Sequence, residues 1–224
     1  MVKNDDFLET FLDSLKYAFS NMSALLVGGI VFFLSLILIG LPFFLGYITR
    51  CMRQIMAGDG VLPEWENVTG MFRDGIRMVI VFLAYAVMFA VVIALPAIPV
   101  LVFSYLNMRY MVLLSTAALI FTMTVMLSVF AIVFFASWVL YASYGSVRIA
   151  LSPRRIKQLI SLNPVGYLIA LLASVAVMAV GSISALLLVI IPWVAFAACA
   201  AITFIYAKYY QNTMKSASVW YAHE

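Results

Sequence analysis

The chain alternates between long apolar runs and short segments in which charged residues return. Crossing about 30 Å of hydrocarbon takes roughly 20 apolar residues in a helix, and four charge-free runs reach that length. The last run is too long for one crossing and contains a Gly-Ser-Ile-Ser break at 181–184, so we interpret it as two helices. The pattern predicts five spans, over about residues 23–49, 78–103, 110–147, 163–182 and 185–208.

Three short segments beside the spans place apolar and charged residues on opposite helical faces, a pattern typical of helices that lie in the membrane interface. They cover residues 5–22, the stretch from Trp65 to Ile76, and the stretch that follows Ser152-Pro153. The chain therefore predicts an all-α fold, a polytopic transmembrane helix bundle of about five spans with short amphipathic interfacial helices. All of it belongs to a single integral membrane domain, residues 1–224.

Three features of the spans leave alternatives open. A bend at Gly40-Leu41-Pro42 would turn the first run into a re-entrant hairpin and change the number of crossings from five to six. A helix from Tyr110 to Tyr144 would be roughly 50 Å long, so it must tilt, break or project. Pro96, Pro99 and Pro192 can break helices near the outer surface, and we expect them in loops.

Lysine and arginine residues set the orientation, because short cytoplasmic loops are enriched in them. Ten of the thirteen basic residues flank the inner loops at 50–77 and 148–162 or follow the last span, whereas Arg109 lies near the opposite turn. Five crossings then predict a multi-pass protein of the cell (plasma) membrane with a cytoplasmic C-terminus and the N-terminus outside. The re-entrant alternative would return the N-terminus to the cytoplasm.

Composition supports the membrane interpretation. Hydrophobic residues make up 67% of the chain and charged residues 10%, whereas about a quarter of a soluble domain is charged. The net charge of +4 could suggest nucleic acid, but the basic residues lie beside apolar runs, where they set topology. We therefore expect no nucleic-acid partner.

The predicted spans lack ionisable side chains. No Asp or Glu occurs between Asp13 and Asp59 or between Asp74 and Glu224, and the single histidine lies at the end of the chain. Coupled carriers usually need an ionisable group within the bundle, and intramembrane hydrolases need a positioned acid, base or metal ligand. The two cysteines have no metal-ligand spacing. We expect no catalytic residue, no cofactor, no metal site and no enzymatic activity.

Hydroxyl side chains within the spans allow two interpretations. They could line a path for a neutral solute, or each could bond a carbonyl three or four residues back in its own helix. We favour the second. The hydroxyl residues are Ser115, Thr116, Thr122, Thr124, Ser128, Ser174, Ser182, Ser184 and Thr203.

The first inner loop is the most distinctive segment. It contains Gly46-Tyr47 with Arg50, then Leu62-Pro63-Glu64-Trp65, then Asp74-Gly75. Pro63 can start a helix and Glu64 favours the positive end of that helix. Set between apolar runs, these motifs resemble the family of polytopic membrane proteins catalogued as domain of unknown function forty-thirteen, found mainly in archaea and some bacteria. The resemblance implies an integral membrane protein of archaeal or bacterial type and no established activity, ligand or catalytic residue.

The functional hypothesis is a lipid-facing scaffold or accessory subunit of a membrane complex. Its partners would be the lipid bilayer, including anionic lipids, and a membrane protein or a second copy of the chain. The basic residues could equally serve topology alone. The expected docking loop comprises Pro63, Glu64, Trp65 and Asp74, and the expected lipid headgroup contacts are Arg50, Arg53, Arg154, Arg155 and Lys157.

Two other classes remain open. A permease or channel for a small or hydrophobic solute would use hydroxyls, carbonyls and helix breaks. An intramembrane enzyme is the least favoured class, since it would require the acids and arginines of the inner loop to converge on one pocket. Those residues are Asp59, Glu64, Glu66, Arg73 and Asp74.

Overall fold

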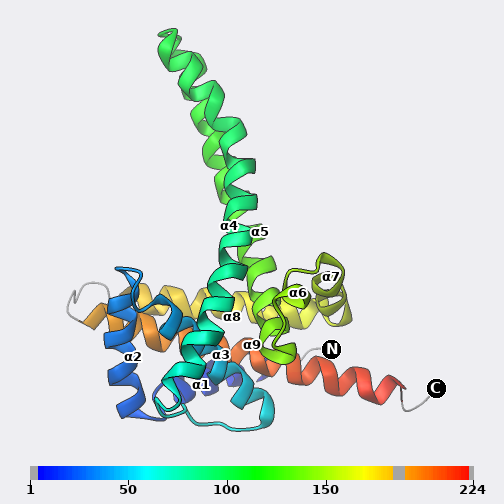
Figure 1. Ribbon diagram of the computed structural model, residues 1–224. Coiled ribbons are helices and arrows are strands. Elements are labelled where there is room, and N and C mark those ends of the chain that lie inside the picture. The colour runs from blue at the N-terminus through cyan, green and yellow to red at the C-terminus, as the bar shows by residue number, and fades with distance from the viewer. Residues whose placement is uncertain (1–4, 184–189, 222–224) are drawn as a thin grey trace. The chain divides into compact units, whose positions relative to one another are not determined.

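The computed structural model describes residues 5–183 and 190–221, which are largely helical and contain no strand within those two ranges (Figure 1). The predicted all-α fold is confirmed. The chain divides into two compact units. We call residues up to 79 together with those from 136 onward the body, and residues 80–135 the hairpin; each is described by itself.

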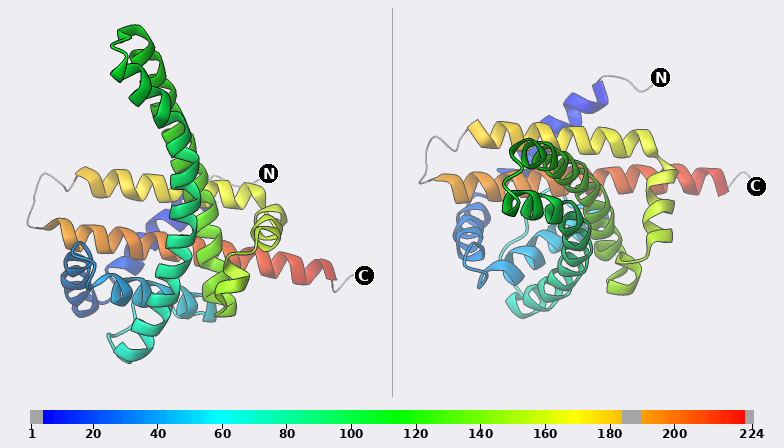
Figure 2. Two further views of the ribbon diagram at one scale, coloured as in Figure 1. Left: turned by 45° about the horizontal axis from the view of Figure 1, so that its top comes forward. Right: turned by 90° about the horizontal axis from the view of Figure 1, so that it is seen from above.

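Helix α9 (Ile191–Tyr221) is the central helix of the body. It packs against α1 (Asp5–Ala18), α2 (Met22–Ser35), α3 (Leu41–Ala57) and α8 (Pro164–Ile183). Figure 2 shows α8 running alongside α9. Because α9 has neighbours on several sides, its residues from Phe196 to Ala207 are almost all buried, as expected of a helix that is apolar all round.

The first apolar run forms two helices, whereas the sequence predicts one over residues 23–49. Asn21 caps α2, its Oδ1 accepting a hydrogen bond from the Ala24 amide at 3.2 Å. The helix ends at Ser35, and Leu38 adopts a positive φ of 66°. Pro42 then lies in the first turn of α3, a position where its missing N–H costs nothing. The break falls beside Gly40, where the alternative interpretation placed a bend.

Two short helices follow the last turns of α5 in the body. They are α6 (Val147–Ala150) and α7 (Pro153–Leu162), and α7 forms where the sequence predicts its third amphipathic segment. Ile156 and Leu159 are buried, whereas the charged residues on the opposite face are exposed. The second segment differs from the prediction, because its residues from Val68 onward are the first turns of a much longer helix.

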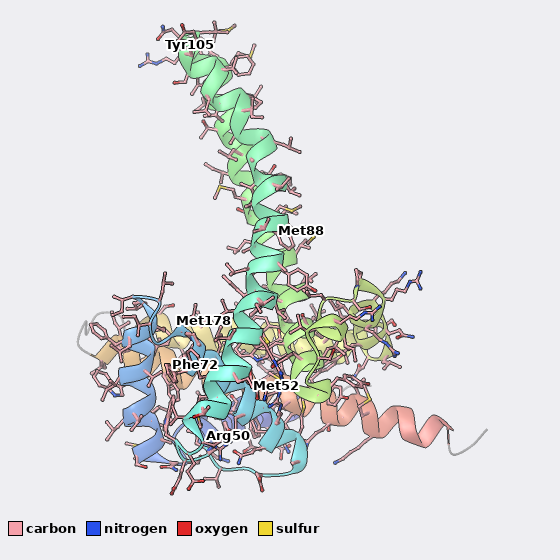
Figure 3. All side chains as sticks on the ribbon, in the orientation of Figure 1. Arg50, Met52, Phe72, Met88, Tyr105 and Met178 are labelled. Atoms are coloured by element: carbon pink, nitrogen blue, oxygen red, sulfur yellow. The ribbon has the colours of Figure 1, made fainter. Side chains whose placement is uncertain are left out.

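The hairpin consists of the greater part of α4 (Val68–Tyr105) and α5 (Arg109–Tyr144), joined by a turn in which Asn107 has a φ of 55°. Its two helices meet through edge-on phenylalanine rings, and two of the rings on α5 stack on each other. Most other apolar side chains point outward, as Figure 3 shows for Met88 and Tyr105. The rings belong to Phe82, Phe89, Phe130 and Phe134.

The expectation that Pro96 and Pro99 lie in a loop is wrong. Both lie inside α4, which continues to Tyr105. Proline removes one backbone hydrogen bond, but helices in a membrane tolerate it when local adjustments and neighbouring helices satisfy the freed carbonyl. The sequence alone does not distinguish a proline that ends a helix from one that lies inside a continuous membrane helix.

Four helical stretches are long and apolar enough to cross a membrane: α4, α5, Pro164–Ser182 and Ile191–Lys215. Helices α1 and α2, which meet at 84°, would make a fifth if the bent pair counts as one span. This agrees with a polytopic protein of about five spans. The break predicted at 181–184 and the start of the span predicted at 185–208 fall partly at residues 184–189, outside the described ranges.

Candidate functional site

We call residues 46–75, which contain the motifs of the first inner loop, the motif segment. Two of its glycines allow α3 and α4 to approach until their backbones touch. A Cβ on Gly46 would lie 1.8 Å from the carbonyl oxygen of Met71, and one on Gly75 would lie 1.6 Å from that of Pro42. Any side chain at either position would therefore collide with backbone, which cannot rotate away. The glycines of the motif thus fix how these two helices cross.

The Leu62-Pro63-Glu64-Trp65 stretch folds back onto the body. Tyr47 donates from its hydroxyl to the Pro63 carbonyl at 2.7 Å, and its ring stacks on Trp65 with centroids 4.0 Å apart. The Trp65 indole donates to the Ala24 carbonyl at 3.0 Å. Leu62 is buried, and its amide donates to the Ser20 hydroxyl at 2.9 Å. Leu62, Pro63 and Trp65 therefore make contacts within the body, whereas Glu64 is exposed.

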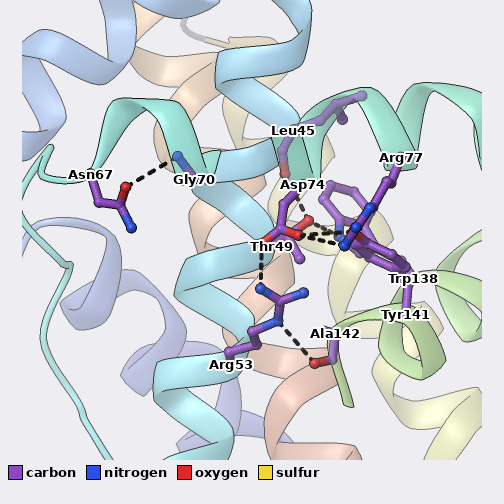
Figure 4. A network of polar contacts seen from close by, with 10 residues as sticks. All are labelled: Leu45, Thr49, Arg53, Asn67, Gly70, Asp74, Arg77, Trp138, Tyr141 and Ala142. Carbon is purple, nitrogen blue, oxygen red and sulfur yellow. Dashed lines mark hydrogen bonds and ion pairs between the residues drawn. The ribbon is translucent and has the colours of Figure 1, made fainter. Parts of the chain in front are cut away.

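Asp74 is the centre of a polar network that joins three helices (Figure 4). Its carboxylate accepts from the Arg53 guanidinium of α3 and from the Tyr141 hydroxyl of α5, the latter at 3.0 Å. Arg77 lies 3.8 Å away. Arg53 Nε also donates to the Ala142 carbonyl at 3.1 Å. The pair is only partly shielded, with about 35% of the Arg53 side chain and 22% of the Asp74 side chain exposed.

The sequence analysis missed several polar contacts in and near this network. Asn67 accepts at Oδ1 from the Gly70 amide at 3.1 Å in the first turn of α4. Trp138 donates to the Thr49 hydroxyl at 2.9 Å. Tyr141, near the end of α5, is also absent from the residues that the sequence singles out. Its distance of 67 positions from Asp74 in the chain left no local signal of their contact.

Cys51 lies on α3 one turn after Tyr47 and is fully buried. Burial raises the pKa of its thiol to about 12, because the charged thiolate would lose its hydration. The thiol is therefore protonated at neutral pH and behaves as a small apolar packing group rather than as a nucleophile.

The acids and arginines required by an intramembrane enzyme are largely dispersed. Arg50 donates to the Glu66 carbonyl and lies 4.0 Å from the Glu66 carboxylate. Arg73, Asp59 and Glu64 are exposed, and no ion pair involves them within the described residues. Of these residues, as far as the described part of the chain shows, only Asp74 pairs with more than one charged side chain.

The basic residues of α6 and α7 have a different environment. Their side chains are exposed, and within the described part of the chain no ion pair involves them. On the other face of α7, Leu159 is buried, and its carbonyl accepts from the Tyr209 hydroxyl of α9 at 2.9 Å. We call these residues the basic α7 surface: Arg148, Arg154, Arg155 and Lys157.

The hydroxyl residues of the predicted spans bond mainly within their own helices. Among the described ones, Ser174 donates to the Ala170 carbonyl at 2.7 Å and Thr203 to the Cys199 carbonyl at 2.8 Å. Ser184 lies outside the described residues. This agrees with the favoured interpretation of local helix bonds. The same i−4 bond is made by Ser115, Thr122, Thr124, Ser128 and Ser182.

Fold and contacts together define a polytopic helical membrane protein whose motif segment joins helices of the body. The chain belongs to the family described as Protein of unknown function (DUF4013), whose model matches residues 29–190. That range contains the motif segment, the hairpin and the basic α7 surface, and it ends just before α9. No curated protein and no solved structure matches the chain.

Proposed function

We propose that the protein is a lipid-facing scaffold or accessory subunit of a membrane complex, and that the basic α7 surface binds anionic lipid headgroups. The observation that carries the proposal is the contrast between the motif segment and the basic α7 surface. In the motif segment, the polar groups of Tyr47, Trp65 and Asp74 form hydrogen bonds within the protein. Arg154 and Arg155 keep theirs exposed.

The chemistry of α7 suits a membrane surface. A short helix that holds apolar side chains against the protein and basic side chains outward can meet phosphate groups without losing its packing. Each basic residue near an anionic surface contributes about 1 kcal/mol of attraction. Location in a cell membrane, with this surface and the C-terminus on the cytoplasmic side, is part of the proposal and follows from the distribution of Lys and Arg.

The permease alternative has weaker support. It relies on hydroxyl groups that can face a solute, whereas Ser174 and Thr203 donate to carbonyls of their own helices. Of the four residues expected to form the docking loop, Glu64 is the most open to a partner, because Pro63 is buried and Trp65 and Asp74 contact other groups of the body.

Matched double variants test the lipid contact. Arg154→Gln/Arg155→Gln removes two charges from the basic α7 surface, and Arg73→Gln/Arg109→Gln removes two exposed charges elsewhere. Each protein is reconstituted in vesicles with equal phosphatidylglycerol and phosphatidylcholine, extracted mildly, and analysed for retained lipid. We expect the wild type and the Arg73/Arg109 variant to retain excess phosphatidylglycerol, and the Arg154/Arg155 variant to approach the vesicle ratio. Equal retention by the two variants would contradict the proposal.

A further inference from the structure

A cavity of about 310 Å³ lies within the body between α1, α8 and α9, apart from both the motif segment and the basic α7 surface. Its volume is at the lower end of the range of small-molecule sites. Thr10 contributes from α1, Ile169 and Ala173 from α8, and Ile205 and Lys208 from α9. The cavity therefore combines polar and apolar walls.

The polar wall favours an anion. Among the described lining residues, Lys208 is the one that carries a charge, and none is a carboxylate. Its side chain is exposed, and its Nζ lies 5.5 Å from the centroid of the Phe204 ring. No ion pair engages Lys208 within the described residues. A cation in this state has the capacity to bind a phosphate group.

Asn163 adds a hydrogen-bond donor to the same cavity. Its Oδ1 accepts from the Gly166 amide at 2.9 Å, which fixes the side chain at the start of α8. The amide nitrogen of this side chain can then donate to an oxygen in the cavity. A lysine and an amide donor are both groups that can bind phosphate oxygens.

The apolar wall suits a hydrocarbon chain. Ala170 and Ala173 are buried and small, so they leave room between α8 and α9, and Ile169 and Ile205 flank that room. Tyr209 also lines the cavity, and its hydroxyl donates a hydrogen bond to the Leu159 carbonyl of α7. Burying methylene groups here would be favourable at about 0.8 kcal/mol for each one.

We infer that this cavity binds one anionic phospholipid, with its phosphate at Lys208 and Asn163 and part of an acyl chain against Ile169, Ala173 and Ile205. The inference goes beyond the proposed function, because it assigns a single-lipid site that shares no lining residue with the basic α7 surface. Either site can exist without the other.

Native mass spectrometry of the full chain in detergent tests this site, with dioleoyl phosphatidylglycerol as the probe and dioleoyl phosphatidylcholine as the uncharged-headgroup comparison. We expect one phosphatidylglycerol to bind at least fivefold more tightly than phosphatidylcholine. Lys208→Gln should weaken that first binding step about fivefold, and Lys208→Arg should restore it. Val165→Trp, at an exposed residue of the lining, should weaken binding by filling the cavity.

The Arg154→Gln/Arg155→Gln variant separates this inference from the proposed function, since it should leave the first binding step unchanged. Unaltered affinity in both Lys208→Gln and Val165→Trp would overturn the inference, as would equal binding of the two lipids. Displacement of phosphatidylglycerol by millimolar inorganic phosphate would identify a free-phosphate site and would also overturn the assignment to a lipid.

Discussion

At the scale of single residues, the motif glycines have the clearest physical role. Gly46 and Gly75 each face backbone of the opposite helix at a distance that excludes any Cβ. Gly60, which lies in the same segment, has no atom within 4 Å of the position of a Cβ. Three glycines close together in the sequence thus have different tolerance, and only the folded chain distinguishes them.

We expect Gly46→Ala and Gly75→Ala each to destabilise the protein by about 1–3 kcal/mol, because overpacking here pushes backbone against backbone. Gly60→Ala is the matched control and should leave stability within about 0.5 kcal/mol. The measurement is the free energy of unfolding in mixed micelles. If all three variants unfold alike, the close approach of α3 and α4 is not what these glycines provide.

At the scale of elements, helical periodicity predicted α7 well and α4 poorly. The sequence alternates apolar and charged residues from Trp65 to Ile76, which predicts a separate interfacial segment. In the structure, the helix that begins at Val68 continues without interruption into the apolar run. One helix whose first turns are amphipathic and whose later turns are apolar therefore gives the sequence pattern of two separate elements. The first run shows the converse, since its unbroken apolarity conceals the end of α2 at Ser35.

The Asp74 network is a polar link between elements of the body, joining α3 and the first turns of α4 to the last turns of α5. A double-mutant cycle of Arg53→Gln and Asp74→Asn should give a coupling energy of about 1 kcal/mol, kept modest by the partial exposure of both side chains. High salt should reduce it. The exposed Asp59→Asn is the control.

Additive effects of Arg53→Gln and Asp74→Asn on the free energy of unfolding would show that their contact does not stabilise the body. Coupling of similar size between Arg53→Gln and Asp59→Asn would instead point to a general charge effect. Either outcome would remove Asp74 from its role as a link.

For the whole molecule, the sequence predicted the class of protein and left the use of its motif open. Long charge-free runs indicate membrane helices because the bilayer imposes a length and a composition. The same logic cannot tell whether Trp65 faces a partner or the protein itself, since an exposed aromatic anchor and a stacked one have the same sequence signature. The contacts of Tyr47 and Trp65 supply that answer.

Exposed arginines were easier to predict. Arg154 and Arg155 lie on the polar face of a periodic segment with buried Ile156 on the other, as the spacing indicates. The sequence groups Arg50 and Arg53 with them as expected headgroup contacts, yet each donates to groups within the body. The difference lies in tertiary contacts, because their partners at Glu66 and Ala142 are remote in sequence.

Hydrogen exchange in nanodiscs tests most directly the claim that lipid meets the basic α7 surface and not the motif segment. Amides of residues 153–162 are compared in phosphatidylglycerol and phosphatidylcholine discs, because bound lipid should suppress local opening of α7. We expect slower exchange there with phosphatidylglycerol and no change over residues 62–66. Protection over 62–66 with none over 153–162 would contradict the account.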